Sequence, residues 1–229
     1  MTQEVSMPML TSYIGQHIEL TISGRPQLDI GLLVDAGDDI VVIFRQDRYY
    51  YIPTKHIHHF RIIPSPEKEE ETLYENPLEW AAGESISFRK TLFNARGVFM
   101  EVYMTGIHTL SGYLTSIMND YLVFYSTVFH TVYVPLDHVK SIMPYPANKP
   151  PYLLKNERLN VKPTGLTLAR TFEQQLKKME GSLAVIDHGE TPDKLGLFQS
   201  VDQGFLTLVM ADGERVVWNI QHIKSVHLP

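Results

Sequence analysis

Three histidines close together in the first part of the chain come nearest to the spacing of a metal site. If this segment is a β-strand, His56 and His58 share one face about 7 Å apart, and His59 points the other way. Two imidazoles can begin a zinc or nickel site, but pairs without a carboxylate or a third histidine rarely suffice. His56 and His58 are therefore the candidate ligands, and we expect no bound metal.

Catalytic chemistry has little support in the sequence. The chain contains no cysteine, which excludes disulfides, thiolate zinc sites and cysteine nucleophiles. It also lacks a nucleophile elbow, a phosphate-binding glycine loop and an HExxH helix. Asp187, His188 and Glu190 form a polar cluster, which we interpret as a solvated turn. We predict a protein that is not an enzyme and needs no cofactor.

Nucleic-acid binding is a second chemistry that the sequence can test. Tyr49, Tyr50 and Tyr51 could stack on bases, although strand alternation places at least one of them in a core. The formal net charge is −6, and the lysines and arginines are scattered, whereas affinity for phosphates needs them clustered. We therefore do not expect nucleic acid as a partner.

The histidine at position 56 also belongs to a pattern that occurs three times. His56, His138 and His222 each follow a short strand of β-branched or aromatic residues and a break, and each precedes another apolar strand. We expect these histidines to be hydrogen-bonded within the turn between the last two strands of each copy. Glycines precede them at nearly constant distances, and those that open a strand are Gly31, Gly112 and Gly196. Such a period outweighs a prior based on length, so the 229 residues indicate three small modules.

Each copy is predicted to contain one short helix followed by five short strands. The stripe Leu168, Phe172, Leu176 and Met179 has helical spacing, and Gly181 stands just past it, where a left-handed cap is expected. Asp212-Gly213 favours a type I′ hairpin turn. The strands are expected at 17–22, 30–35, 40–45, 48–52 and 57–62, at 98–104, 112–117, 121–126, 131–134 and 139–143, and at 182–186, 195–200, 205–209, 215–218 and 223–227.

The predicted architecture is mainly β, with three tandem small five-stranded barrels, each with a short N-terminal helix. A sheet this small buries its apolar face by bending strongly, and the helix covers one open end. The copies span 10–63, 86–144 and 165–229. An acidic linker separates the first two at 64–85, and a proline-rich, extended linker separates the last two at 145–164.

The repeated endings carry a resemblance to a known family. Asp137-His138-Val139-Lys140-Ser141-Ile142 and Gln221-His222-Ile223-Lys224-Ser225-Val226 resemble the spore coat protein B family of endospore-forming bacilli, whose repeats close on a His-ϕ-Lys-Ser-Ile stretch (ϕ, apolar). The first copy's ending, His56-Ile57-His58-His59-Phe60, lacks the Lys-Ser pair. The helix, the turn glycine and the final His-ϕ strand also look like the Sm-like small barrel, and this resemblance implies that the three predicted barrels are of Sm-like or SH3-like type.

The resemblance to the spore coat protein B family implies a structural component of the bacterial endospore coat, synthesised in the mother-cell cytoplasm. Its implied partners are other spore coat proteins and further copies of itself. The alternative is an RNA- or small-ligand-binding module of Sm-like type. The sequence has no apolar run that could span a membrane and does not begin like a signal peptide, so we expect no membrane partner and otherwise a cytoplasmic location.

Association is the function that the barrel resemblance places on particular residues. Sm-like barrels join neighbours by pairing strand four with strand five, so we expect the copies to pair in this way within one chain or between chains. The strand-four residues expected to line these contacts are Tyr51, Ile52, Tyr133, Val134, Val217 and Trp218.

Overall fold

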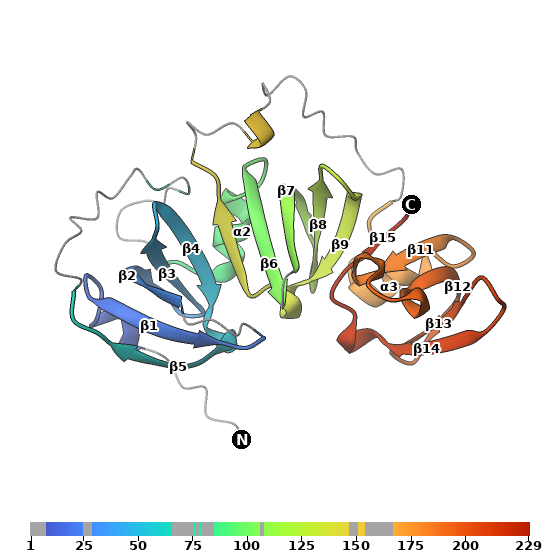
Figure 1. Ribbon diagram of the computed structural model, residues 1–229, viewed down its shortest axis with the longest axis horizontal. Helices are drawn as coiled ribbons and strands as arrows, with labels where there is room; N and C mark the ends of the chain where they lie inside the picture. Colours follow the sequence, from blue (N-terminus) through green and yellow to red (C-terminus); the bar gives the residue numbers. More distant parts are fainter. Residues whose placement is uncertain are drawn as a thin grey trace. The chain divides into compact units, whose positions relative to one another are not determined.

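The computed structural model describes residues 8–24, 29–65, 76, 78, 85–105, 108–146, 151–153 and 167–229. Within these residues the chain forms fifteen strands and a few short helices (Figure 1). Every strand pairing for which a register is defined is antiparallel, and the prediction of a mainly β protein is confirmed. No helix in the described part of the chain is long and apolar enough to cross a membrane.

The described residues group into two compact units. The first takes residues up to Leu110 and again from Val139 to Leu154. Its neighbouring strands follow the order β5-β1-β2-β3-β4-β10-β6. Its elements are α1 (Pro8–Thr11), β1 (His17–Ile22), β2 (Asp29–Ala36), β3 (Ile40–Arg45), β4 (Arg48–Pro53), η1 (Thr54–His56), β5 (Ile57–Ile62), α2 (Phe88–Asn94), β6 (Phe99–Thr105), β10 (Ser141–Pro144) and η3 (Pro151–Leu153).

The second unit takes residues 111–138 and 155–229. Its strands follow the order β7-β8-β9-β15-β11-β12-β13-β14. Its elements are β7 (His108–Ile117, which begins in the first unit), β8 (Tyr121–Ser126), β9 (His130–Pro135), η2 (Leu136–His138), α3 (Phe172–Lys177), β11 (Leu183–Ile186), η5 (Asp187–Gly189), η6 (Pro192–Lys194), β12 (Leu195–Asp202), β13 (Phe205–Val209), β14 (Arg215–Asn219), η7 (Ile220–His222) and β15 (Val226–His227).

The three sequence copies share one pattern of strand pairing. In the first copy β1 pairs with both β2 and β5, and in the third β11 pairs with both β12 and β15. The second strand of each copy carries a register shift, at Leu33/Asp35, Leu114/Ser116 and Phe198/Ser200. Such bulges bend a sheet sharply. The middle copy contributes β6 and β10 to the first unit and β8 and β9 to the second, so three tandem barrels remain a prediction.

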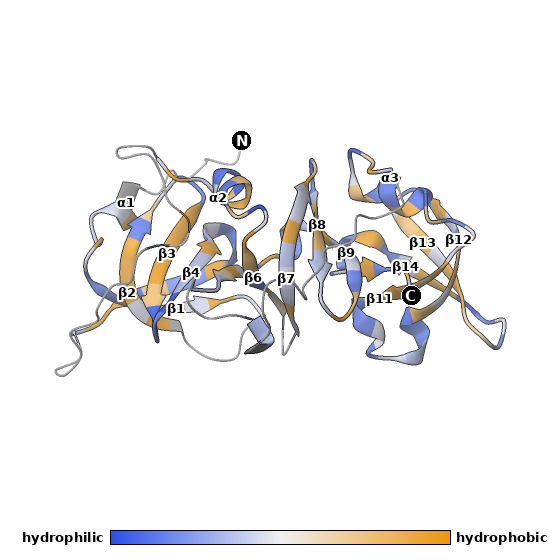
Figure 2. Ribbon diagram, turned by 90° about the horizontal axis from the view of Figure 1, so that it is seen from above, coloured by the Kyte–Doolittle hydropathy of each residue, from blue (hydrophilic) through white to orange (hydrophobic). Residues whose placement is uncertain are grey.

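Apolar side chains of the strands form the core of each unit, and Figure 2 shows their hydrophobic colouring along β1–β4 and β11–β13. The core of the second unit includes Phe172, Leu176 and Met179, three residues of the predicted stripe. The helix is shorter than that stripe, because the Thr171 hydroxyl caps it by accepting from Gln174 N, and Leu168 precedes it. The linkers expected at 64–85 and 145–164 lie mostly outside the described residues.

Two local expectations are wrong. The fifth strands of the second and third copies begin at Ser141 and Val226, later than 139 and 223, although the first copy's strand begins directly after the same kind of 3-10 turn. The turn at Asp212-Gly213 is not of type I′, since only Gly213 has positive φ there. A type I′ pair occurs instead at Gln46-Asp47, with φ of 48° and 61°.

The repeated glycines expected to open the second strand of each copy lie within β2, β7 and β12 and stand against a neighbouring backbone. A Cβ at Gly31, Gly112 or Gly196 would lie 2.5, 2.0 or 2.3 Å from a carbonyl oxygen of the adjacent strand. These distances are shorter than any real contact of a Cβ, so the close approach of the two strands requires glycine.

Gly196→Ala should destabilise the second unit by about 1–3 kcal/mol, because the added methyl group forces the paired strands apart. Gly181→Ala is the matched control, since its Cβ would meet nothing within 4 Å and the only cost is that of alanine at a φ of +79°, about 1 kcal/mol. Chemical denaturation of both variants measures the difference. Equal losses would contradict the close-approach explanation.

Candidate functional site

Two strand pairings join one sequence copy to the next, and we call them the first joint and the second joint. In the first joint β4 pairs with β10, with Tyr51 opposite Ile142. In the second β9 pairs with β15, with Tyr133 opposite Val226. Figure 1 shows β10 between β4 and β6, and β15 between β9 and β11. Each joint therefore pairs the fourth strand of one copy with the fifth strand of the following copy.

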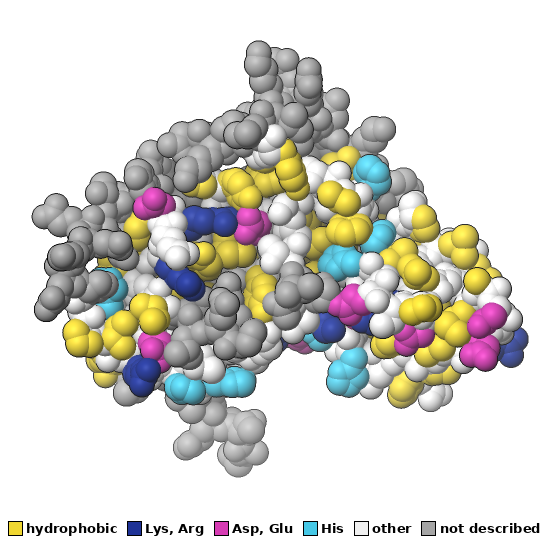
Figure 3. All heavy atoms as spheres, viewed as in Figure 1, with side chains coloured by type: hydrophobic (Ala, Val, Ile, Leu, Met, Phe, Trp, Pro, Cys, Tyr) yellow, Lys and Arg dark blue, Asp and Glu magenta, His cyan; other side chains and the backbone are white. Residues whose placement is uncertain are grey.

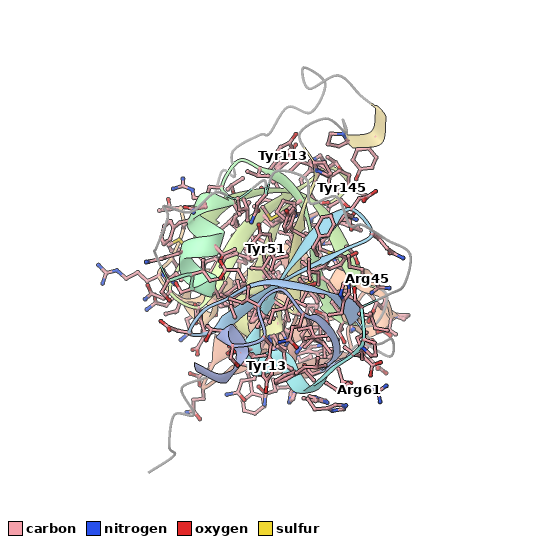
Figure 4. All side chains as sticks on the ribbon, turned by 90° about the vertical axis from the view of Figure 1, so that its left-hand side faces the viewer. Tyr13, Arg45, Tyr51, Arg61, Tyr113 and Tyr145 are labelled. Carbon is pink, nitrogen blue, oxygen red and sulfur yellow. The ribbon has the colours of Figure 1, made fainter. Side chains whose placement is uncertain are left out.

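The structure places four of the six expected contact residues in these joints. Tyr51, Ile52, Tyr133 and Val134 are each at most 1% exposed. The Tyr51 hydroxyl donates to the Asn76 side chain, and burial raises the pKa of that hydroxyl (Figure 4).

The other two expected residues lie on β14, which has only β13 as a neighbour among the described strands. Val217 is 61% exposed. Trp218 is partly buried, and its indole Nε1 donates to the Asp193 carbonyl oxygen at 3.2 Å. The role of all six residues in association stays a prediction.

An acidic residue after the second strand connects each of the first two copies to the helix of the next. Asp39 Oδ1 accepts from Phe88 N at 2.7 Å, and Asp120 Oδ1 accepts from Phe172 N at 2.8 Å. The carbonyl oxygen of each aspartate also accepts from the turn that follows strand four. A helix start has unsatisfied N–H groups, so each aspartate supplements the N-cap of a helix and fixes that helix to the preceding copy.

The aligned histidines also contact the following copy. His56 Nδ1 lies 3.0 Å from Lys140 Nζ, which donates to Ser23 Oγ at the same distance. His138 Nε2 lies 2.8 Å from the Gln221 carbonyl oxygen, which can only accept, so Nε2 carries the proton. His56 and His138 thus each contact the following copy across a joint, and His56 Nδ1 also lies 3.4 Å from Ser23 Oγ of its own copy.

The arrangement of the candidate metal ligands differs from the sequence expectation. His56 ends the 3-10 turn η1, whereas His58 lies on β5, so they do not share a strand face. His58 is exposed, and His59 Nε2 lies 3.2 Å from Thr21 Oγ1. Across the described ranges, no three residues of metal-ligating type come together.

The Lys-Ser pair of the repeated ending is a structural feature of each joint. Ser141 and Ser225 are fully buried. The carboxylate of Asp187 accepts from the backbone N–H groups of Lys224 and Ser225 at 2.8 and 3.0 Å and lies 3.2 Å from Lys194 Nζ. The interpretation of this loop as a solvated turn is wrong, because Asp187 is 4% exposed and holds the start of β15.

A charged cluster that the sequence did not predict spans β10 in the first joint. Arg48 on β4 and Glu101 on β6 are paired, with 3.1 Å between Nη1 and Oε2. The Tyr145 hydroxyl donates to Glu101 Oε1 at 2.6 Å, and the Arg48 guanidinium lies over the Tyr145 ring. Burial and the Glu101 carboxylate raise the pKa of Tyr145 to about 12. These contacts fasten the outer strands of the joint across the central one.

An aromatic cluster adjoins the second joint. The Phe129 ring packs against the His188 and His227 rings, with centroids 4.7 and 5.2 Å apart. Burial, followed by the nearby His188 and His130, lowers the pKa of His227 to about 4. His227 is therefore neutral at physiological pH and packs as an aromatic residue at the end of β15.

The second unit also contains a cleft of about 710 Å³. It lies where the η2 and η7 turns approach the start of α3. The cleft is lined by Asp120, Pro135, Asp137, His138, Phe172, Glu173, Gln203, Gly204, Phe205, Asn219, Ile220 and Gln221. Carboxylates outnumber cationic groups in this lining, so the cleft favours a cationic or neutral occupant over a phosphate.

Asp120→Ala should destabilise the second unit by about 1 kcal/mol, because Phe172 N at the start of α3 loses its acceptor while the Thr171 cap remains. Asp202→Ala removes an exposed carboxylate from the same unit and serves as the control. Thermal unfolding measures both variants. A similar small change in both would show that the Asp120 contact contributes nothing to the second joint.

The stability of the second unit should fall as the pH is lowered from about 6.5 toward 4. In this window the unfolded chain binds a proton at His227 that the folded chain does not, so the slope of stability against pH is positive. His227→Phe should flatten part of that slope, whereas His222→Phe at an exposed position should leave it unchanged. Unfolding midpoints measured at several pH values test this, and an unaltered slope in His227→Phe would refute it.

Two comparisons with known proteins agree with one another. A family model described as the YwrJ third domain matches residues 171–226, the third copy from the cap of α3 to β15. The uncharacterized protein YwrJ of Bacillus subtilis (strain 168) is 39% identical over 226 residues, which are 97% of this chain and 100% of that protein. Similarity to spore coat protein B remains a resemblance of the repeated endings.

Proposed function

The chain belongs to the YwrJ family, and we propose that it is a non-enzymatic structural component of the bacterial endospore coat, acting as an assembly protein. The observation that supports this most is that both joints are built from the same three kinds of contact. Each pairs strand four with strand five, caps the next helix with an aspartate and engages the aligned histidine. A chain that builds one contact repeatedly is suited to assembly.

The spore coat is proposed from the repeated endings and from the source of the relative. The His-ϕ-Lys-Ser-ϕ endings resemble those of the spore coat protein B family of endospore-forming bacilli, and the relative comes from Bacillus subtilis. On this proposal the chain is synthesised in the mother-cell cytoplasm and contacts other coat proteins. We further propose that each copy is a small five-stranded barrel that shares core residues with its neighbour.

A fluorescent fusion of this chain in sporulating Bacillus subtilis tests the coat location. We expect fluorescence to surround the developing spore and to remain with the coat fraction of purified spores. The fluorescent protein alone is the control and should stay in the mother-cell cytoplasm. A fusion that spreads evenly through the mother cell, while still full-length on a blot, would refute the coat proposal.

The cleft in the second unit favours a second candidate, a small-ligand-binding module. Its aromatic Phe205 is 48% exposed, and carboxylates stand beside it. A cationic amine is the ligand class that such a surface suits. Calorimetric titration with a polyamine tests this candidate. RNA binding is a separate alternative, and a purified protein whose ultraviolet absorbance shows no nucleic acid would argue against it.

A further inference from the structure

We propose that separate molecules of this protein join end to end, with β14 of one chain pairing with β5 of the next chain. The inference rests on the proposed assembly function and names the partner as a second copy of this chain. The proposal follows from the strand edges that stay unpaired once the two internal joints have formed.

Not every fourth and fifth strand of the three repeats has a partner in a neighbouring repeat. The fourth strands β4 and β9 pair with the fifth strands β10 and β15 of the copies that follow them. Among the described strands, β14 has only β13 beside it, and β5 has only β1. One fourth-strand edge and one fifth-strand edge therefore remain, and they are the two halves of a further joint.

The internal joints also specify the register of this further joint. Tyr51 opposite Ile142 and Tyr133 opposite Val226 occupy the same positions relative to the aligned histidines. Applied to the edges of β14 and β5, this register places Val217 of one chain opposite Phe60 of the next chain. The adjacent pair, His227 opposite Val132 in the second joint, likewise places Arg61 opposite Val216.

Burial at equivalent positions indicates that a surface is uncovered on the third copy. Tyr51 and Tyr133 are 0% and 1% exposed, whereas Val217 at the same position is 61% exposed. Tyr121 faces Pro135 across β8 and β9 and is 0% exposed, whereas Phe205 in the same place on β13 is 48% exposed.

The outer face of β12–β14 thus carries apolar side chains in the open, and Figure 3 shows apolar groups gathered over β13 and β14. Its exposed apolar residues are Leu195, Leu197, Phe205 and Val217. Contiguous patches of this kind mark interaction surfaces.

In the second joint, the equivalent face of the preceding copy is part of the next copy's core. Tyr121, Val123 and Tyr133 pack in one cluster with residues of the third copy such as Ile223 and Val226. On the receiving side, Phe60 packs against the core of the first unit and meets the Tyr13 ring, with centroids 5.9 Å apart. Val217 would extend that core as Tyr133 does in the second unit.

The β5 edge is open to a further strand. His58 and His59 are exposed, and Ile62 is 44% exposed. Arg61 points away from the fold in Figure 4 and pairs with Glu19 on the neighbouring β1, with 2.6 Å between Nε and Oε1. Its charge is thus already compensated, and β5 contains no proline that would prevent pairing.

The end-to-end joint keeps fewer contacts than the internal joints. Gly204 stands where Asp39 and Asp120 cap the next helix, so the carboxylate is absent. His58 and His59 replace the Lys-Ser pair of the other endings. Strand pairing and apolar burial remain, and the association is therefore reversible and depends on concentration.

Cysteine cross-linking tests the register, because the chain has no cysteine of its own. Under mild oxidation, the double variant Arg61→Cys/Val216→Cys should give a ladder of dimers and larger species on a non-reducing gel. The control Arg61→Cys/Arg215→Cys places the second thiol one residue along, on the opposite face of β14 and more exposed. Absence of a ladder, or an equal ladder in the control, would overturn the proposed register.

Light scattering at increasing concentration tests the association itself. The average mass of the natural protein should rise above that of a single chain, and Val217→Asp should abolish the rise. Val128→Asp is the matched control, since Val128 is 67% exposed but lies outside β14 and β5. A constant mass in the natural chain, or an equal loss in both variants, would overturn the joint. A coat-located fusion would then still support the proposed function, and the two failures are distinguishable.

Discussion

Backbone hydrogen bonding at the edge of a small sheet is the constraint on which the rest of this structure depends. An unpaired edge strand exposes N–H and C=O groups that readily pair with any other strand. In this chain, each of the first two copies offers the edge of its fourth strand to the fifth strand of the next copy. The contacts around the joints, from the aspartate caps to the Arg48–Glu101 pair, hold the pairing in a single register.

Sharing of core residues explains why the compact units do not coincide with the sequence copies. Tyr133 belongs to the second copy by sequence but packs in the core of the third. Tyr103 and Met143 likewise belong to the second copy but pack in the core of the first unit. The middle copy is therefore divided between the two units, and its strands derive their burial from both neighbours. Stability in such a chain depends on interfaces between neighbours as well as on single repeats.

The sequence was sufficient for the elements whose signal is local. Short runs rich in β-branched and aromatic residues predicted β1, β3, β5, β8 and β13 with their observed bounds. The sequence did not predict contacts across a joint, because residues such as His56 and Lys140 are far apart in the chain. The aspartate caps had a detectable signal: an acid follows strand two at Asp39 and Asp120, whereas glycine stands there in the third copy. The burial of Asp187 had no detectable signal, because an aspartate in an exposed loop and an aspartate that binds buried backbone N–H groups look alike in sequence.

Tethering determines how strongly equal strand contacts hold within a chain and between chains. Within the chain, a linker keeps the two halves of a joint at an effective concentration in the millimolar range, so modest contacts are enough to close it. Between chains, the same pairing also has to offset the loss of translational and rotational freedom on association. The helix caps and the Lys-Ser ending belong to joints that are already tethered, whereas the terminal edges lack both. The chain thus combines permanent internal joints with terminal edges whose pairing follows the local concentration of the protein.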